Sequence, residues 1–380
     1  MAGDLRVELD SLLEESSAAC QSRERDTFDS MIGTKSGLVL FGAGGLGRKM
    51  LTALRNVRIE PLAFADNKLA GQFVEGVPVL TPREAAKIYG KSATFVVTIW
   101  ASWADTMREQ VETLRAAGCQ SVVSFIPLLW KFPSLLPHTQ IDLPSRVLEQ
   151  RDEVRRCFDL WSDEESRQEF VSQLRWRILG DFEALNPPLP NPYWQNDLIR
   201  LKRDAVFVDA GAFNGDTIAQ FVSFVSGQFR AAYAFEPDQH NLKALEERLS
   251  AMPKDIRSRI HIYERAVSDR DYEISFQGGV GASSSSGPGS ETVRCVALDT
   301  ILPEVPDFIK YDIEGFELSG LAGTRQLITE KQPALAVCAY HIQDHIWRIP
   351  LLIQSFSQKY RFYLRPHGQI WETVCYAIPA

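Results

Sequence analysis

Residues 206–216 read VFVDAGAFNGD, an apolar run that ends in an acidic residue and a glycine-rich turn. Asp209 closes the run, and Gly211 and Gly215 follow it at a spacing of four. Glycines at such a turn let a ligand approach the backbone where a strand leads into a helix. The segment therefore predicts a strand, a ligand-binding turn and a helix in an α/β domain.

A second acid stands at the end of the next expected strand. The run AAYAF (231–235) is followed by Glu236, in a position from which a carboxylate accepts ribose hydroxyls. Asp209, at the first turn, suits a cofactor with an ammonium group, and the small residues after it leave room for a carboxylate tail. Together these features predict a site for S-adenosylmethionine.

Strand-like and helical stretches alternate in two parts of the chain, which favours parallel sheets with crossover helices. We expect an α/β fold with two Rossmann-like domains joined by a helical linker. The expected segments are an N-terminal helix over 1–35, a Rossmann-like nucleotide-binding domain over 36–127, the linker over 128–192 and a second domain over 193–380. Tyr193 and Trp194, which follow the proline-rich end of the linker, either close over the ligand or form a hydrophobic seam.

The first domain has a glycine-rich turn of its own. Gly42, Gly44 and Gly47 form a GxGxxG pattern between the apolar run LVLF and a helical stretch, and Asp66 ends the following strand. This pattern lets a diphosphate approach a helix N-terminus while the acid accepts ribose hydroxyls. The alternative is a packing turn in a Rossmann-like domain that has lost its ligand, and the sequence leaves both interpretations open.

The first domain also resembles the N-terminal nucleotide-binding part of bacterial sugar acyltransferases. The resemblance rests on LVLFGAGGLGRKMLTAL, PLAFADN and GVPVL and covers about 90 residues. It implies a nucleotide or nucleotide-sugar ligand in this domain, with Asp66 as the first residue to test.

From Tyr193 to Arg365 the chain resembles the FkbM family of S-adenosylmethionine-dependent methyltransferases. The matching blocks are VDAGAFNGDT, AFEPD, RAVSD, GASSSS, VALDTIL and DFIKYDIEGFE, in this order. The resemblance implies a class I methyltransferase fold for the second domain. It also implies O-methylation of a hydroxyl on a sugar, a glycan or another natural product.

Carried over to this sequence, the resemblance implies two sets of site residues. The set expected to bind the cofactor consists of Asp209, Gly211, Asn214, Gly215 and Asp216 for the methionine and ribose portions, Glu236 for the ribose, and Ala266 and Val267 for the adenine. Asp312 and Glu314 would face the transferred methyl group, because open α/β sheets bind ligands at the carboxyl edge. Helix capping is the alternative role for Asp209, Asp216, Asp312 and Glu314.

A general base would assist the transfer. His341 ends the run LAVCAYH, and its unperturbed pKa near 6.5 suits accepting a hydroxyl proton; Asp312 is the other candidate. His341 and His345 are four residues apart, but zinc sites need three or four convergent ligands, so no metal site is predicted. A magnesium ion held loosely on Asp312 stays open.

Composition excludes several classes of partner. The 380 residues carry 41 basic and 49 acidic side chains, a net charge of −8, and neither half has the basic excess of a nucleic-acid binder. The six cysteines show no CxxC spacing, the N-terminus lacks a signal-peptide pattern, and the longest apolar run is too short to span a membrane. We therefore expect a cytoplasmic protein with a small-molecule or saccharide acceptor, and leave a homo-oligomer open.

Two alternatives to the methyltransferase remain. One is a nicotinamide-dependent oxidoreductase acting on nucleotide sugars through Gly42, Gly44, Gly47 and Asp66. The other is a non-catalytic nucleotide-binding protein built from two Rossmann-like domains.

Overall fold

The computed structural model describes residues 2–33, 37–99, 107–133, 140–277, 285–286, 291–368 and 372–380. The chain divides into two compact units. The first unit consists of Met1–Arg151, Val171–Pro187 and Gly368–Ile370, and the second of Asp152–Phe170, Pro188–His367 and Trp371–Ala380. The residues expected to form a separate linker, 128–192, are thus shared between the two units.

The first unit contains a mostly parallel sheet. Its order over the described residues is β3-β4-β2-β1-β5-β6, and only β3 is antiparallel to its neighbour. The strands are β1 (Leu38–Phe41), β2 (Ala63–Ala65), β3 (Phe73–Val74), β4 (Val77–Leu80), β5 (Thr94–Val97) and β6 (Ser121–Ser124). The strand order reverses at β1, so the expected ligand position lies at the carboxyl ends of β1 and β5.

The N-terminal segment forms two helices, where the sequence suggested one. Ser16 adopts an extended conformation and its hydroxyl accepts a hydrogen bond from the Ala19 N–H at 3.3 Å, so a new helix begins there. The helices of this part of the chain are α1 (Ala2–Leu13), α2 (Ser17–Ile32), α3 (Gly45–Asn56), α4 (Pro82–Tyr89), α5 (Met107–Ala116), α6 (Ile126–Lys131), α7 (Pro144–Glu149), α8 (Arg151–Phe158), α9 (Glu164–Leu179) and the 3-10 helix η1 (Phe182–Ala184).

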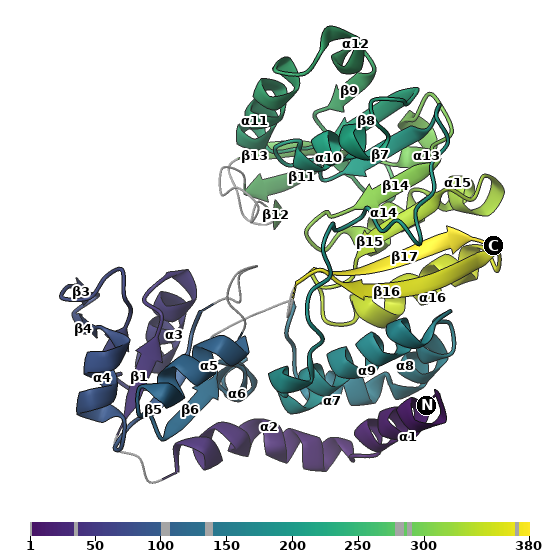
Figure 1. Ribbon diagram of the computed structural model, residues 1–380. Coiled ribbons are helices and arrows are strands. Elements are labelled where there is room, and N and C mark those ends of the chain that lie inside the picture. Colours follow the sequence, from purple (N-terminus) through teal and green to yellow (C-terminus); the bar gives the residue numbers. More distant parts are fainter. Residues whose placement is uncertain are drawn as a thin grey trace. The chain divides into compact units, whose positions relative to one another are not determined.

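The second unit is built on a larger sheet, which we call the main sheet. Its order over the described residues is β16-β17-β15-β14-β7-β8-β9, and β17 is antiparallel to both of its neighbours. Its strands are β7 (Val206–Ala210), β8 (Ala231–Phe235), β9 (Ile260–Tyr263), β14 (Phe308–Tyr311), β15 (Ala334–Cys338), β16 (Tyr360–Pro366) and β17 (Thr373–Pro379). β17, β15, β14 and β7 lie side by side in Figure 1. The α/β class predicted from the sequence is confirmed.

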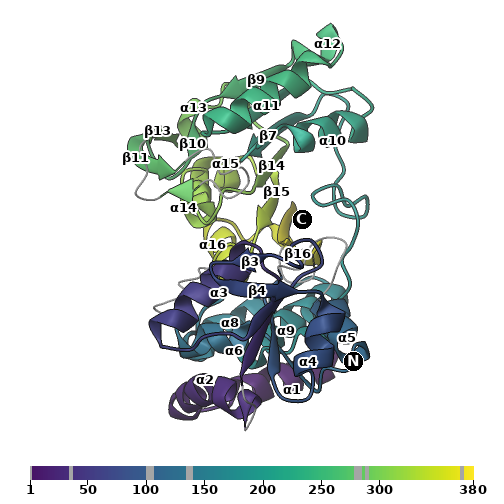
Figure 2. The same ribbon diagram turned by 90° about the vertical axis from the view of Figure 1, so that its left-hand side faces the viewer.

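A smaller sheet, labelled at β10, β11 and β13 in Figure 2, accompanies the main sheet. Its strands are β10 (Ala266–Val267), β11 (Tyr272–Gln277), β12 (Ser285–Ser286) and β13 (Glu291–Val296). The helices of this part of the chain are α10 (Asp216–Phe224), α11 (Gln239–Ser250), α12 (Lys254–Arg257), α13 (Leu298–Ile301), α14 (Glu317–Ala322), α15 (Arg325–Glu330) and α16 (His345–Phe356).

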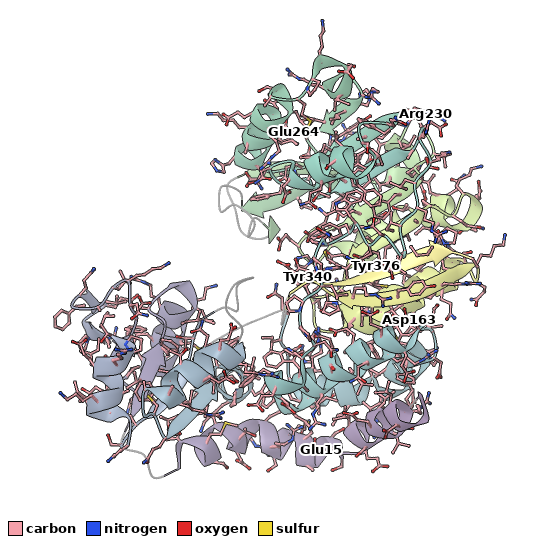
Figure 3. The ribbon with its side chains drawn as sticks, viewed as in Figure 1. Glu15, Asp163, Arg230, Glu264, Tyr340 and Tyr376 are labelled. Carbon is pink, nitrogen blue, oxygen red and sulfur yellow. The ribbon has the colours of Figure 1, made fainter. Side chains whose placement is uncertain are left out.

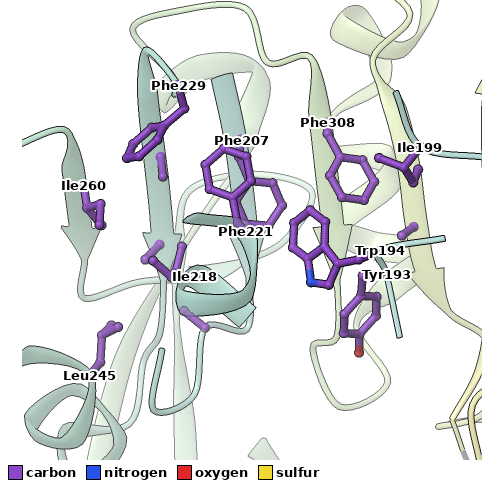
Figure 4. Packing of buried hydrophobic residues seen from close by; sticks show 14 of the residues in the cluster. Tyr193, Trp194, Ile199, Phe207, Ile218, Phe221, Phe229, Leu245, Ile260 and Phe308 are labelled. Carbon is purple, nitrogen blue, oxygen red and sulfur yellow. The ribbon is translucent and has the colours of Figure 1, made fainter. Parts of the chain in front are cut away.

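An aromatic cluster fills one face of the main sheet. Trp194 is 5% exposed, and its ring centroid lies 5.4 Å from that of Phe207 and 5.6 Å from that of Phe308 (Figure 4). Phe207 and Phe308 are register partners on β7 and β14. Trp194 is therefore a core residue. Of the two interpretations of the sequence, this agrees with the hydrophobic seam.

Candidate active site

The glycine-rich turn after β7 requires its glycines. Gly211 has φ +84°, and a Cβ there would lie 1.8 Å from the carbonyl oxygen of Asp312. Gly215 has φ +79°, and a Cβ would lie 2.5 Å from Leu245 Cδ1. A side chain at either position would clash with these atoms and would be strained, because the backbone at both glycines is left-handed. The turn therefore packs directly against Asp312, the residue that follows β14.

Glu236 lies against the same turn. Its Oε2 accepts a hydrogen bond from the Phe213 N–H at 2.8 Å, and its Oε1 accepts from the Asp238 N–H at 2.9 Å and from Asn241 Nδ2 at 3.3 Å. Burial raises the pKa of Glu236, and these hydrogen bonds oppose that shift. The structure thus brings the turn and the acid of the second strand together.

Asp209 is not placed where the sequence predicted it, beside the ammonium group of the cofactor. Its side chain has no exposed surface, and its Oδ1 lies 3.0 Å from Lys310 Nζ on the neighbouring strand. A carboxylate paired in this way does not reach a ligand's ammonium group. Lys310 also donates a hydrogen bond to the Gly211 carbonyl at 2.6 Å, so the pair supports the turn from inside the sheet.

Burial raises the pKa of Asp209 to about 6, against the attraction of Lys310. Burial alone would lower the pKa of Lys310, but the carboxylates of Asp209 and Asp312 outweigh it and raise that pKa. Both members of the pair are therefore charged at neutral pH.

The remaining residues expected at the cofactor lie around the turn. Asn214 receives a hydrogen bond from Arg248 Nε to its carbonyl at 2.8 Å, and Asp216 is exposed in the first turn of α10. Ala266 and Val267 form β10, which pairs with β13. Val267 is buried within the protein, so only Ala266 of the two keeps exposed surface.

A cavity of about 320 Å³ opens beside the ends of β8 and β9. One wall comes from residues that follow these strands, and the other from the small sheet. The lining residues are Pro237, Gln239, Glu264, Arg265, Glu273, Thr292, Val293 and Arg294. Glu264 is labelled in Figure 3. Pro237, one of these lining residues, directly follows Glu236 in the chain.

Asp312, which directly follows β14, is the centre of a polar cluster. Tyr193 donates its hydroxyl to Asp312 Oδ2 at 3.0 Å, and Tyr340, labelled in Figure 3, donates to Oδ1 at 3.4 Å. Lys310 Nζ lies 3.9 Å from the same carboxylate. Tyr193 therefore combines a buried ring with a polar contact at the site, although its neighbour Trp194 belongs to the core.

The structure brings His341, Asp312 and Glu314 together, as the sequence predicts. His341 Nε2 lies 3.4 Å from Asp312 Oδ1 and 3.7 Å from Glu314 Oε2. The other ring nitrogen, Nδ1, lies 2.8 Å from Oε1 of the fully buried Glu317. Three carboxylates therefore surround one imidazole ring, and we call Asp312, Glu314, Glu317 and His341 the acidic cluster.

This arrangement argues against the proton-accepting role expected of His341. Burial alone would lower its pKa, but Glu317, Asp312 and Glu314 outweigh burial and raise the pKa to about 9. At neutral pH the ring already carries both protons. Burial and the negative charges of Asp312 and Glu317 raise the pKa of Glu314 to about 7, against His341, so Glu314 titrates where a general base is most effective.

Sequence reasoning missed Lys310 and Glu317. Lys310 appears only as an interruption in the apolar run DFIKYDI, and Glu317 as one of several acids in DIEGFE. A lysine inside a buried strand was the available signal, because an unpaired charge there is strongly disfavoured. In the described ranges, no group of three or more His, Cys, Asp or Glu side chains is arranged to hold a metal ion.

The glycine-rich turn of the first unit has a comparable construction. Gly42 has φ +113°, a Cβ on Gly47 would lie 2.0 Å from the Gly42 carbonyl oxygen, and Gly44 has no heavy atom within 4 Å of its Cβ position. Asp66 accepts hydrogen bonds from the N–H groups of Ala43 at 3.0 Å and Lys68 at 2.8 Å. The first and third glycines are required for packing, and the second leaves open space.

Residues 209–370 match the family model described as the methyltransferase FkbM domain. The second unit therefore carries an FkbM domain. FkbM domains are the catalytic domains of S-adenosylmethionine-dependent methyltransferases. The enzyme class predicted from the sequence is therefore confirmed. The matched residues include the glycine-rich turn, Glu236 and the acidic cluster, whereas Tyr193 precedes them.

One solved structure has the same fold along nearly the whole chain. The methyltransferase FkbM from Methylobacillus flagellatus KT is 22% identical, covers 96% of this chain and 99% of its own, and has a TM-score of 0.76. The Streptococcus mutans protein SMU.1697c in complex with SAH is 13% identical over 50% of this chain and 98% of its own, with a TM-score of 0.32. An rRNA methylase from Streptococcus thermophilus is 15% identical over 47% and 88%, with a TM-score of 0.31.

No curated protein matches the chain. The resemblance of residues 36–127 to sugar acyltransferases stays a prediction. In the described ranges, no helix combines the length and the apolar character that a membrane crossing needs.

Proposed function

We propose that the FkbM domain transfers a methyl group from S-adenosylmethionine to a hydroxyl of a saccharide or related natural product. The observation that carries this proposal is the contact between the glycine-rich turn and the acidic cluster. Gly211 lies so close to the Asp312 carbonyl that a Cβ would be only 1.8 Å from it. A cofactor seated on the turn would therefore lie beside the carboxylates that face the acceptor.

The residues present fit this cofactor. Gly211 and Gly215 leave the backbone of the turn open to a ligand, and Glu236 stands beside the turn to accept ribose hydroxyls. The cavity lined by Pro237, which directly follows Glu236, offers space for the nucleobase. When bound, the cofactor supplies an electrophilic methyl group on a sulfonium. Asp209 supports the turn through Lys310 and does not contact the ligand.

The acidic cluster binds and deprotonates the methyl acceptor. Asp312, held by Tyr193 and Tyr340, accepts a hydrogen bond from the acceptor and orients it. Glu314 takes the proton that the reacting hydroxyl loses, because its pKa of about 7 leaves it partly ionised at neutral pH. His341 keeps its own proton and stabilises the carboxylates beside it. Ionised carboxylates only accept hydrogen bonds, so they suit a methyl acceptor whose many hydroxyl groups donate them.

Calorimetry with S-adenosylhomocysteine tests the cofactor site directly. We expect binding to the wild type, and at least tenfold weaker binding to Glu236→Gln, which keeps the shape of the side chain and removes its charge. Glu247→Gln, an exposed change on α11, is the matched control. Absence of binding to the wild type, or equal binding to Glu236→Gln, would overturn the proposed site.

Mass spectrometry tests the acceptor class. The enzyme is incubated with deuteromethyl cofactor and separate saccharide, phenol and amine fractions. We expect the label on a saccharide hydroxyl. Label on an amine alone would overturn the hydroxyl assignment, and label on a phenol alone would overturn the saccharide class.

We further propose that the first unit binds the nucleotide portion of an activated sugar. The open space at Gly44, between two glycines that packing requires, supports a diphosphate position beside the first turn of α3. UDP-sugars are expected to raise the unfolding temperature of the chain. A shift with NADH alone would favour the oxidoreductase alternative, and no shift with any nucleotide would favour a packing turn.

A further inference from the structure

Glu317, the first residue of α14, is a buried junction of four contacts. Its side chain has no exposed surface. Its Oε1 accepts hydrogen bonds from the Ile313 N–H at 3.0 Å, from the Gly315 N–H at 3.4 Å and from His341 Nδ1 at 2.8 Å. Its Oε2 lies 3.1 Å from Nδ1 of His345, the first residue of α16. One carboxylate thus joins the turn after β14 to two histidines.

The turn that Glu317 holds is the one that carries Glu314. Glu314 has φ +54°, a left-handed conformation that a side chain other than glycine adopts only when its surroundings impose it. The two N–H groups bound by Glu317 belong to Ile313 and Gly315, the residues on either side of Glu314. Glu317 therefore fixes the strained residue from both sides.

The same carboxylate fixes the imidazole of His341. With Nδ1–H directed at Glu317, Nε2 is left to face Asp312 and Glu314 at 3.4 and 3.7 Å. The ring is 4% exposed and lies against the Tyr340 ring at 4.2 Å between centroids. The orientation of His341 thus depends on Glu317.

The charged and titratable groups around this junction come from several elements. Asp312 and Glu314 follow β14, His345 begins α16, and Lys310 approaches Asp312 from within the main sheet. Glu372, just before β17, also interacts with the charge of Asp312. Glu317 is the one among these that contacts both His341 and the backbone of the turn, as far as the described residues show.

We propose that Glu317 is a positioning residue: it presents Glu314 to the acceptor and keeps His341 protonated, so that Glu314 receives the acceptor's proton. The proposal rests on the proposed methyl transfer to a hydroxyl. During that transfer the acceptor O–H bond breaks and the proton passes to Glu314. The oxygen's electron pair forms the bond to the methyl carbon while the methyl–sulfur bond breaks, and the electron pair of that bond leaves on the sulfur of S-adenosylhomocysteine. His341 gives up no proton in this step, and its charge opposes the negative charge of the neighbouring carboxylates.

Glu317→Gln separates charge from shape. The amide oxygen still accepts from the Ile313 and Gly315 N–H groups, but the negative charge next to His341 is gone. NMR titration of the His341 ring is expected to give a pKa about 9 in the wild type and a value at least one unit lower in Glu317→Gln. An unchanged His341 pKa in Glu317→Gln would overturn the proposal. This measurement needs no turnover, so its outcome is independent of whether the proposed function is correct.

The pH profile of kcat/KM supplies the second readout. We expect the wild-type activity to fall on the alkaline side as His341 loses its proton, and we expect that limb to move at least one unit lower in Glu317→Gln. Glu317→Asp, which keeps the charge on a shorter side chain, should retain the wild-type alkaline limb with a kcat at least tenfold lower. Equal profiles for wild type and Glu317→Gln would show a purely structural role and overturn the proposal.

Two controls accompany the measurements of the His341 pKa and of the pH profile. Glu330→Gln makes the same chemical change at an exposed position on α15 and should leave both readouts unchanged. Binding of S-adenosylhomocysteine should stay within twofold of wild type in Glu317→Gln. If Glu317→Gln does not fold, Glu317→Asp tests the proposal instead. An alkaline limb at least one unit lower in Glu317→Asp would overturn the proposal, because this variant keeps the negative charge beside His341.

Discussion

Lys310 Nζ lies 3.0 Å from Asp209 Oδ1, and the two side chains are 2% and 0% exposed. They are register partners on β14 and β7, the two central strands whose ends carry the acidic cluster and the glycine-rich turn. A buried charge pair is costly to break, because removal of one partner leaves the other charge without compensation. This pair therefore ties the stability of the main sheet to the geometry of the active site.

Lys310→Met should lower the free energy of unfolding by about 3–5 kcal/mol, because it leaves Asp209 buried and unpaired. The double variant Asp209→Asn/Lys310→Met should recover part of this loss. Urea denaturation measures both, and the exposed Lys331→Met should change the value by no more than about 0.5 kcal/mol. A loss for Lys310→Met as small as that of Lys331→Met would contradict the buried-pair account.

Gly211→Ala should abolish cofactor binding. The new Cβ would lie 1.8 Å from the Asp312 carbonyl oxygen at a backbone φ of +84°, so the turn and the end of β14 must separate. Gly71→Ala is the control, since Gly71 has a similar φ of +82° with no atom within 4 Å of the Cβ position. Calorimetry with S-adenosylhomocysteine should show binding for Gly71→Ala and none for Gly211→Ala; comparable affinities would exclude the turn from the cofactor site.

Tyr193→Phe should lower kcat about tenfold with a smaller effect on KM, since a hydrogen bond to a charged group contributes about 1.5–3 kcal/mol. The change removes the hydroxyl that holds Asp312 at 3.0 Å and keeps the buried ring. Tyr233→Phe removes a similar hydrogen bond, to Glu304 at 2.8 Å, outside the acidic cluster and should leave kcat unchanged. Steady-state kinetics of the two variants side by side would reject the role of Tyr193 if both behaved alike.

His341 should make stability depend on pH. Its folded-state pKa of about 9 lies above the ordinary value of 6.5, so the contribution is complete below pH 6.5 and is lost as pH rises through about 9. The shift corresponds to about 3 kcal/mol. Unfolding free energies measured from pH 6 to 10 should therefore fall more steeply in the wild type than in His341→Gln, and parallel curves would contradict the assigned protonation state.

Gly44 and Gly47 should respond to alanine in opposite ways. Gly47→Ala places a Cβ 2.0 Å from the Gly42 carbonyl oxygen and should destabilise the first unit, whereas Gly44→Ala meets open space and should not. If a diphosphate occupies that space, Gly44→Ala should remove the thermal shift given by UDP-sugars. Thermal unfolding with and without the nucleotide distinguishes the two effects, and a shift retained in Gly44→Ala would move the ligand elsewhere.

The sequence placed Gly211, Glu236 and Asp312 near one another because parallel strands bring their carboxyl ends to one edge of a sheet. Local patterns do not contain the pairing register of distant strands. For this reason the partnership of Lys310 with Asp209, 101 residues earlier, could not be read from the chain, and Asp209 was expected at the ligand. The pKa of His341 was missed for a related reason, since it depends on Glu317 reaching the ring from another element.

The position of β17 in the main sheet constrains how this edge of the sheet assembles. β17 lies between β16 and β15 and pairs with both, although β16 precedes it in the chain. Within the main sheet, as far as the described residues show, β16 is therefore connected to β15 only through β17. Until β17 inserts, β15 has an unpaired edge at which a strand of another chain could add, so the last step in forming this edge also removes a site of misassembly.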